Sequence, residues 1–331
     1  MILSVCIPTY NRFDCLSELL DLLINEIIKY NISDICEICI SDNCSEDKTN
    51  EYIHYLSSKY PFIRVKRNEV NLGFAINILN VATMAKGDFI WFFSDDDLII
   101  EGSLKKVIDL LSKELEKVCA VYVNWIYFTN CNGTNSVIEN MGTGFRQNDI
   151  NICEVNRNEL LEMTNHKCTF MSSNIVKKEI FIKNLSNDLV GRSTFPHFEY
   201  MMRSLTNNDR ILLVSEPLIM ARAFNQYYDV NNTIWSGISK MLQEFRLAGF
   251  SGSAIKKAKR HTAKEIAISA ILAKSKSLME AKSKILILEA FYYDCKVELY
   301  LCKLAYILPV KILNNIVYLC KKIKKFFNAF M

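Results

Sequence analysis

Glycine and proline are scarce in this chain, which has 10 Gly and five Pro among 331 residues. This small share argues against a disordered chain and against an all-β fold with many turns. The chain also lacks an uncharged apolar run close to the roughly 18 residues that a membrane span requires. Half of the residues are hydrophobic. We therefore expect one large folded domain with a smaller appendage.

Acidic residues are absent from the end of the chain. The formal net charge is only +4, but no Asp or Glu follows Glu298, whereas six lysines do. A basic end favours an anionic surface as partner, and we expect no nucleic-acid partner. In residues 310–331 the apolar side chains recur at helical spacing and most lysines lie off that stripe, as in a helix lying on an anionic membrane. A helix packed on the rest of the protein would show the same pattern.

A secretion signal is not evident at the start, because the chain opens with a strand-like apolar segment and no charged region. The twelve cysteines are scattered. Cys36 and Cys39 have CxxC spacing, but residues three apart in a strand face opposite sides and could not jointly hold a metal ion. We interpret the cysteines as reduced core residues and expect a cytoplasmic protein.

Strand-like and helical segments alternate through the first half of the chain. We predict strands at 3–8, 35–41, 62–67, 88–93 and 120–128, and helices at 15–29, 47–59, 74–85 and 103–115. Buried strands that alternate with helices predict a parallel α/β sheet. The segment 130–190 is turn-rich and harder to interpret. Further helices are predicted at 234–248, 253–275, 278–304 and 309–328, so we expect an α/β domain over 1–230 and an all-helical region over 231–331.

Ligands of parallel α/β sheets bind at the carboxyl ends of the strands, so the residues after each strand matter most. Pro8, Thr9, Tyr10 and Asn11 follow the first strand and form a stiff lip with an aromatic face, suited to a nucleobase and ribose. They also fit an ordinary loop in which Thr9 or Asn11 caps a helix. Asp42 ends the second strand, where a carboxylate could accept a base N–H or a ribose hydroxyl.

Two further motifs follow the third and fourth strands. In Asn71-Leu72-Gly73 the glycine allows a tight turn or a close approach to a ligand. The run Asp95–Asp97 emerges from a wholly apolar strand, and three adjacent carboxylates repel one another unless a cation neutralises them. Such hard oxygen ligands suit Mg²⁺ or Mn²⁺ bridging a diphosphate. The alternative is a solvated acidic turn that caps the helix starting near Ser103.

These four motifs, in this order within residues 1–100, resemble the family 2 glycosyltransferases of the GT-A fold. Later segments look like the bacterial O-antigen sugar transferases of the abequosyltransferase type; they are Ser172-Ser173, Val176–Glu179, Phe195-Pro196-His197 and Arg222. The resemblance implies a Rossmann-like, mostly parallel sheet flanked by helices. It also implies an inverting transfer of a sugar from a nucleotide-diphosphate sugar to an acceptor hydroxyl.

The resemblance also implies roles for individual residues. Asp96 takes the place of the last carboxylate of the family's DxD motif and, with Asp97, is expected to hold Mn²⁺ or Mg²⁺. Ser94 stands where the family has the first carboxylate, so either Asp95 substitutes or fewer carboxylates hold the metal. Arg222 is placed to grip the diphosphate, or it forms a surface salt bridge. The residues expected around the donor are Pro8, Tyr10, Asn11, Asp42, Asn71, Gly73, Asp95 and Arg222.

The sequence leaves more than one residue open as the general base. The family usually has an acidic residue there, but the matching position is His197, and a neutral imidazole can take the proton. Otherwise His197 caps the helix or orients the acceptor, and Glu199 or a carboxylate of the Asp95–Asp97 run is the base. His54 and His261 need no special role on their predicted helices, and His166 has no assignment.

The implied acceptor is a lipid-linked oligosaccharide of bacterial surface polysaccharide, O-antigen or capsule, which favours peripheral attachment to the inner face of the plasma membrane. Two alternatives remain. A nucleotidyltransferase shares the sheet and the acidic metal site, but it would need a glycine-rich phosphate loop after the first strand, and this chain has no Gly before Gly73. A weakly catalytic sugar-nucleotide-binding scaffold at the membrane would bind the donor without turnover.

Overall fold

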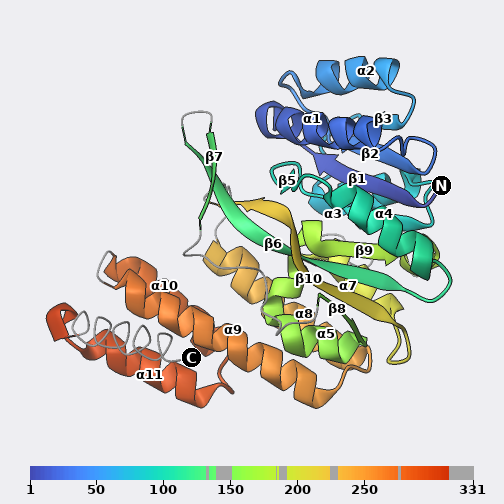
Figure 1. Ribbon diagram of the computed structural model, residues 1–331. Helices are drawn as coiled ribbons and strands as arrows, with labels where there is room; N and C mark the ends of the chain where they lie inside the picture. The colour runs from blue at the N-terminus through green and yellow to red at the C-terminus, as the bar shows by residue number, and fades with distance from the viewer. Residues whose placement is uncertain are drawn as a thin grey trace, which may run out of the picture.

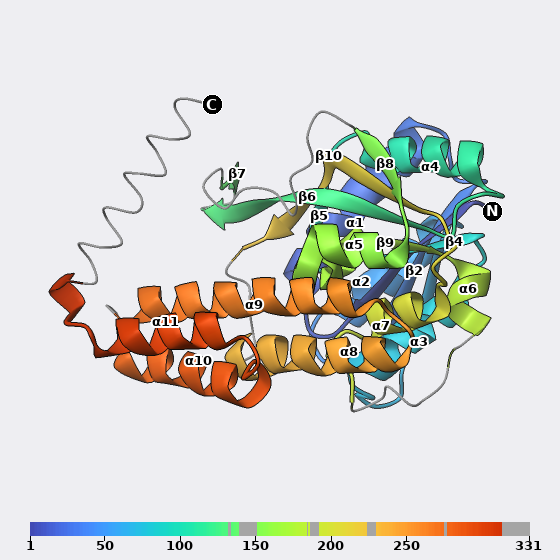
Figure 2. The same cartoon turned by 90° about the horizontal axis from the view of Figure 1, so that it is seen from below.

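The computed structural model describes residues 1–131, 134–138, 151–183, 185, 192–223, 230–274 and 277–312. A ten-stranded sheet has helices on both faces, and the helices after residue 235 extend from one side of it (Figure 1, Figure 2). The α/β fold with a C-terminal helical region, predicted from the sequence, is confirmed.

The strands are β1 (Leu3–Thr9), β2 (Cys36–Asp42), β3 (Ile63–Arg67), β4 (Phe89–Phe92), β5 (Leu98–Ile99), β6 (Ala120–Cys131), β7 (Thr134–Val137), β8 (Ile152–Val155), β9 (Asn174–Lys177) and β10 (Ile211–Arg222). The helices are α1 (Phe13–Lys29), α2 (Thr49–Lys59), α3 (Phe74–Met84), α4 (Ser103–Glu114), α5 (Arg157–Thr164), α6 (Lys178–Lys183), α7 (Pro196–Ser204), α8 (Ser236–Leu247), α9 (Gly252–Ala273), α10 (Leu278–Phe291) and α11 (Lys296–Ile307). Short helical turns are η2 (Asn165–Thr169), η3 (Met171–Ser173) and the π-helical η5 (Val230–Trp235).

The sheet has the order β3-β2-β1-β4-β9-β6-β10-β5. The first four strands are parallel, so the loops after β1, β2 and β4 emerge at one edge. Beyond β4 the sheet is mixed, because β9 runs antiparallel between β4 and β6. The expectation of a mostly parallel sheet holds fully for the half that carries the four motifs, whereas the other half combines the parallel β6–β10 pair with antiparallel pairings. The β9 strand lies in the segment that the sequence left without clear assignment.

The C-terminal helices differ from the prediction at one place. Residues 278–304 form two helices, not one, because α10 ends before Tyr292 and α11 begins at Lys296. The Tyr292 ring is buried and its hydroxyl donates to the Trp235 carbonyl at 2.8 Å, which fixes the reversal of the chain. Both helices then pack against α9. Most of the helix predicted at 309–328, with its basic stripe, lies outside the described residues.

Two clusters of buried side chains form the interior. The larger extends from Leu3 to Ala258 and continues through α8, and the smaller begins at Ala263 and ends at Cys302. The larger core thus crosses residue 230, and the division into 1–230 and 231–331 stays a prediction. Among the described helices, none is both long and apolar enough to cross a membrane.

Gly87 sets the close approach of β4 to β1. A Cβ atom added there would lie 2.7 Å from the Leu3 carbonyl carbon and 2.7 Å from the Ser4 nitrogen. Moving backbone atoms inside a sheet costs free energy, so Gly87→Ala is expected to lower the free energy of unfolding by about 1–3 kcal/mol. Gly252→Ala, where nothing lies within 4 Å, is the matched control. Urea unfolding measures both, and equal stability of the two variants would contradict the constraint.

Candidate active site

The acidic run Asp95–Asp97 lies directly after β4, beside the end of β1. Thr9 Oγ1 donates to Asp95 Oδ2 at 2.8 Å. Arg12 Nη1 lies 2.6 Å from Asp96 Oδ2 and 3.5 Å from Asp95 Oδ1. The register of the two strands brings these loops together, since Cys6 pairs with Phe92 three residues before Thr9 and Asp95. The loop after β1 therefore supplies both a hydroxyl and a cation to the acidic run.

Asp97 is turned into the protein. It is 3% exposed, and its two oxygens accept hydrogen bonds from Ser172 Oγ at 2.6 Å and from the Arg222 backbone N–H at 3.1 Å. Burial, followed by the charge of Asp96, raises the pKa of the Asp97 carboxyl well above its ordinary value. The carboxyl group joins three separate segments: the loop after β4, η3 and the end of β10. These hydrogen bonds fit a side chain that holds the three segments together better than one that is open to a metal ion.

Arg222 is held from three sides in the folded chain. Its Nη2 lies 2.6 Å from Glu18 Oε2, its Nε donates to the Asp96 carbonyl at 2.8 Å, and its guanidinium lies 4.7 Å from the centre of the Phe128 ring. Only 10% of the side chain is exposed, so this is not a surface salt bridge. The structure does bring Arg222 to the acidic run predicted to bind the diphosphate.

The charges gathered here fit a divalent cation. The groups are the carboxyls of Glu18, Asp95, Asp96 and Asp97 and the guanidinium groups of Arg12 and Arg222. With all carboxyls ionised, negative charges exceed positive charges by two, and the donor atoms are the hard oxygens that Mg²⁺ and Mn²⁺ prefer. Burial, opposed by Arg12 and supported by Asp96, raises the pKa of Asp95 to about 7. Burial thus favours the protonated form of Asp95 when no cation is bound.

An asparagine network supports the loops after β2 and β3. Asn71 Oδ1 accepts from Asn43 Nδ2 at 2.7 Å and from Gly73 N at 2.9 Å. Gly73 has φ +81°, a conformation that favours glycine, and its carbonyl accepts the first hydrogen bond of α3. Asn77 Oδ1, on α3, accepts from Ser41 Oγ at 2.7 Å. Asn71 and Gly73, both predicted from the sequence, therefore lie at the same edge of the sheet as the carboxyl end of β2.

Asp42 is fully buried at the end of β2. Its Oδ1 accepts from the Ser45 backbone N–H at 3.0 Å, whereas Oδ2 has no hydrogen bond and lies 3.4 Å from Arg67 Nε. Buried carboxylate oxygens usually have hydrogen-bond donors. The buried Oδ2 atom thus faces the Arg67 guanidinium without a hydrogen bond within the described residues.

The loop after β1 is anchored on the loop after β2. Asn11 adopts φ +52°, donates its backbone N–H to Ser45 Oγ at 2.9 Å and accepts from the Glu46 N–H at 2.8 Å. Pro8 is buried inside β1, whereas the Tyr10 side chain is 41% exposed. Tyr10 is therefore the member of this predicted group that presents a free aromatic face.

His197 and Glu199 lie in the first turn of α7. His197 is 2% exposed; its Nε2 lies 3.0 Å from the Thr169 carbonyl and its ring packs 6.2 Å from that of Phe92. A carbonyl only accepts, so Nε2 carries the proton and Nδ1 carries the lone pair, which has no hydrogen-bond partner. Burial, against the Thr169 hydrogen bond, lowers the pKa of His197 to about 4. Glu199 Oε1 accepts from Ser193 Oγ at 2.5 Å.

Four residues of this site had no role assigned from the sequence: Arg12, Glu18, Asn43 and Asn77. Arg12 directly follows the Pro8–Asn11 lip. A basic side chain just after a strand end is the sequence signal that could have identified Arg12. Asn77 lies inside a helix and carries no sequence signal. Ser172 entered through the resemblance alone, and its contacts with Asp97 and with the Ser94 backbone N–H are visible only in the fold.

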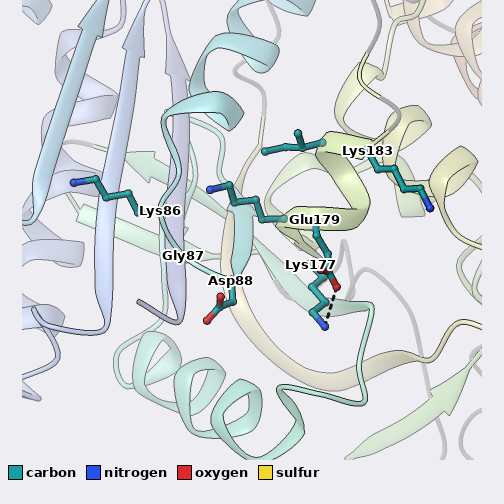
Figure 3. Close-up of a pocket in the computed structure, with 8 residues that line it drawn as sticks. Lys86, Gly87, Asp88, Lys177, Glu179 and Lys183 are labelled. Atoms are coloured by element: carbon teal, nitrogen blue, oxygen red, sulfur yellow. Dashed lines mark ion pairs between the residues drawn. The ribbon is translucent and has the colours of Figure 1, made fainter.

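A lysine-lined recess of about 440 Å³ lies away from this site (Figure 3). Its lining includes Lys86, Asp88 and Lys177, and Gly87 in its wall contacts the start of β1. Since these residues precede β4 or follow the antiparallel β9, the recess lies at the amino ends of β1 and β4. It is therefore at the edge opposite the acidic run and is not the donor site.

The raised pKa of Asp95 predicts how stability depends on pH. The folded chain holds this proton up to about pH 7, whereas an unfolded Asp loses it near 3.8. The folded state therefore binds more protons between these values, and stability falls as pH rises, by at most about 4 kcal/mol. In metal-free buffer, Asp95→Asn should flatten this slope in urea unfolding, and exposed Asp88→Asn should not. A slope unchanged by Asp95→Asn would contradict the assignment.

Known proteins resemble this chain in sequence and in fold. The family description "Glycosyl transferase family 2" matches residues 4–178. Abequosyltransferase RfbV of Salmonella typhimurium is 35% identical over 240 residues, which is 69% of each chain. The S. aureus TarS 1-349 crystal structure in complex with UDP has TM-score 0.61 at 16% identity, and the match covers 92% of this chain and 90% of the TarS 1-349 chain.

Mannosyltransferase PcManGT from Pyrobaculum calidifontis, in complex with GDP-Man and Mn²⁺, has TM-score 0.56 at 12% identity and covers 92% of this chain and 86% of its own. At such identities the structures show the fold alone, which is the GT-A fold that the motifs predicted. Family match, relative and fold agree over the half of the sheet that carries the acidic run. The chain is a member of glycosyltransferase family 2.

Proposed function

We propose that this glycosyltransferase transfers a sugar, with inversion, from a nucleotide-diphosphate sugar to a hydroxyl of a lipid-linked saccharide in the synthesis of a bacterial surface polysaccharide. One observation carries the proposal: the acidic run lies between Arg12 and Arg222 at the carboxyl ends of β1 and β4. A diphosphate with its metal needs carboxylates for the metal and guanidinium groups for the phosphates. The structure has both kinds of group here, because Arg12 and Arg222 contact the acidic run directly.

The nucleoside is assigned to the loops after β1 and β2. Tyr10 offers an exposed ring for the base, and Asp42, which is fully buried in this structure, is assigned to a base N–H or a ribose hydroxyl from its place at the end of β2. Asn11 fixes the first loop, and the Asn71–Gly73 turn closes the pocket beside β3. These roles rest on the position of each group at the shared edge of the parallel strands.

We assign the metal to Asp96, with Asp95 in the place of the first DxD carboxylate that Ser94 cannot supply. Asp97, the other ligand predicted from the sequence, is only 3% exposed and hydrogen-bonded to Ser172 and Arg222, so we assign it to fixing the run, whereas the Asp96 side chain is 15% exposed. A bound Mn²⁺ or Mg²⁺ would neutralise charge on the departing diphosphate. Arg222, which faces the run from β10, stabilises the same charge.

His197 is proposed as the general base, acting through Nδ1. The tautomer with the proton on Nε2 leaves the lone pair of the buried Nδ1 without a hydrogen-bond partner, and the ring is neutral at pH 7. A pKa of about 4 gives this imidazole the basicity of a carboxylate, which is the group that the family usually places here. Glu199 is the alternative in the same turn, and its bond from Ser193 orients it.

A thermal-shift panel of UDP, CDP, GDP and dTDP, each with and without Mn²⁺, tests the donor site. A ligand at a hundred times its dissociation constant stabilises the folded chain by about 2.7 kcal/mol. We expect one nucleotide to raise the Tm in a Mn²⁺-dependent manner. Asp96→Asn should abolish the Mn²⁺ dependence, and Asp88→Asn, at the opposite edge, should retain it. If no nucleotide raises the Tm of the wild type, the proposal is contradicted.

Replacement of His197 tests the base. Because general-base catalysis contributes roughly 10²–10⁴-fold, His197→Ala should lower kcat by that factor, with the nucleotide-induced Tm shift unchanged. Glu199→Gln is the comparison variant, and radiolabelled sugar transfer measures both. Near-normal turnover of His197→Ala, with the pH profile of the wild type, would exclude it as the base. A large loss in Glu199→Gln alone would assign the base to Glu199.

We also propose that the enzyme acts at an anionic membrane surface through α11. Apolar side chains repeat along one face of this helix and are exposed; they are Val297, Tyr300, Leu301, Leu304 and Ile307. A stripe at positions i, i+3, i+4, i+7 and i+10 is typical of a helix that lies on a membrane. The basic residues of 313–331, which follow in the chain, would add attraction to anionic lipids.

Vesicle sedimentation tests the role of α11. Leu301→Glu with Leu304→Glu should weaken binding to vesicles of phosphatidylglycerol and phosphatidylethanolamine at least about tenfold, because two buried leucine side chains are lost. Ile28→Glu is the matched control, since Ile28 is 56% exposed on α1 at the other end of the molecule (Figure 1). Equal binding of both variants would contradict the role of α11.

A further inference from the structure

Two histidines and a glutamate from distant parts of the chain meet where α9 packs against η2. His166 lies in η2, and His261 and Glu265 lie one turn apart on α9. Each offers one ligand atom, and these atoms all lie within 4.8 Å of one another. No sequence pattern connects these residues: from the sequence, His261 needs no special role and His166 has no assignment.

The separations of these atoms match the geometry of a tetrahedral metal site. His166 Nε2 lies 3.1 Å from Glu265 Oε2, and His261 Nδ1 lies 3.7 Å from Glu265 Oε1. Ligand atoms bound to Zn²⁺ at about 2.0–2.1 Å in a tetrahedron are roughly 3.4 Å apart. These two distances lie on either side of this value but end on different oxygens of Glu265. With one ligand atom from each residue, all three atoms lie within 4.8 Å of one another, so side-chain rotations must bring them closer around an ion.

The hydrogen bond on the other side of the His166 ring sets its tautomer. Thr262 Oγ1 donates its single proton to the Ala258 carbonyl at 2.9 Å. Towards His166 Nδ1, 3.4 Å away, this hydroxyl can therefore only accept, which places a proton on Nδ1. A neutral His166 then directs the Nε2 lone pair at a carboxylate oxygen 3.1 Å away. A cation between these two atoms removes their repulsion, and such an outer hydrogen bond is typical of metal-ligating histidines.

We propose that His166, His261 and Glu265 form a zinc site that clamps α9 onto the catalytic part of the chain. Two imidazoles and a carboxylate favour Zn²⁺ over the Mg²⁺ or Mn²⁺ assigned to the acidic run. Three protein ligands leave a fourth position for water. The site is separate from the donor site, and the proposal does not depend on the proposed function.

The clamp acts at the joint between the two buried clusters. The His166 ring packs edge-on against Trp235 at 5.4 Å, and the Trp235 carbonyl accepts the hydroxyl of Tyr292 after α10. The cluster thereby connects η2 with the start of α8, with α9 and with the turn between α10 and α11. Zinc bound there would fix the C-terminal helices, including the exposed stripe of α11, relative to the sheet.

Zinc uptake by the full chain tests this site. The protein, freed of metal with EDTA and desalted, is incubated with ZnCl₂, and bound zinc is measured by mass spectrometry. We expect one zinc per chain and a rise in Tm of roughly 5 °C at saturating zinc. His166→Ala, His261→Ala and Glu265→Gln should each lose both effects. His54→Ala, which removes an exposed histidine on α2, and Asp96→Asn should retain them. Bound Co²⁺ should show the strong visible absorption of a tetrahedral site.

Two results would overturn the proposal. If the wild type takes up no zinc, the chain has no zinc site. If all three cluster variants take up as much zinc as the wild type, the zinc binds at another place. A loss of Tm in Glu265→Gln that is the same with and without zinc would show a plain ion pair between Glu265 and a protonated His166. Circular dichroism of each variant separates loss of metal from loss of fold.

Discussion

The arrangement of the active site depends on the buried carboxyl group of Asp97. A buried acid is tolerated only when its oxygens have donors, and Asp97 receives them from Ser172 and from the backbone of Arg222. These two contacts attach η3 and the end of β10 to the loop after β4. Asp95 and Asp96 are thereby held towards the loop after β1, and the Arg222 side chain is directed to the backbone of Asp96. The catalytic edge of the sheet is assembled around one carboxyl group that itself faces inward.

The parallel half of the sheet could be predicted because its information is local. Apolar runs such as 88–93 and helical spacing such as 15–29 each lie within one segment, and the structure places these elements within two residues of the predicted bounds. The edge that carries the site follows from the same pattern, since parallel strands share their carboxyl ends. Asp42, Asn71 and Asp95–Asp97 could therefore be grouped from the sequence. The family match adds confirmation of the fold and of the enzyme class.

What could not be predicted depends on contacts between distant segments. The β9 strand has four residues, and only its pairing with β4 and β6 makes it a strand. The burial of His197 beneath Phe92 and Phe74 depends on how α7 packs, and no pattern around residue 197 reports it. The meeting of His166 with His261 joins positions 95 residues apart in the chain. In each case the deciding interaction is tertiary, so local propensity carries no signal.

The position of Arg12 has a consequence for the order of events at the site. This side chain ends the same short loop that presents Tyr10, and its guanidinium lies on Asp96, the carboxylate assigned to the metal. On the proposed assignment, a metal ion at Asp96 would compete with Arg12 and leave its guanidinium available to the diphosphate. Arg12 ends the loop that carries Tyr10, so its release would affect the loop assigned to the base. Metal and nucleotide would then be thermodynamically linked, each strengthening the binding of the other.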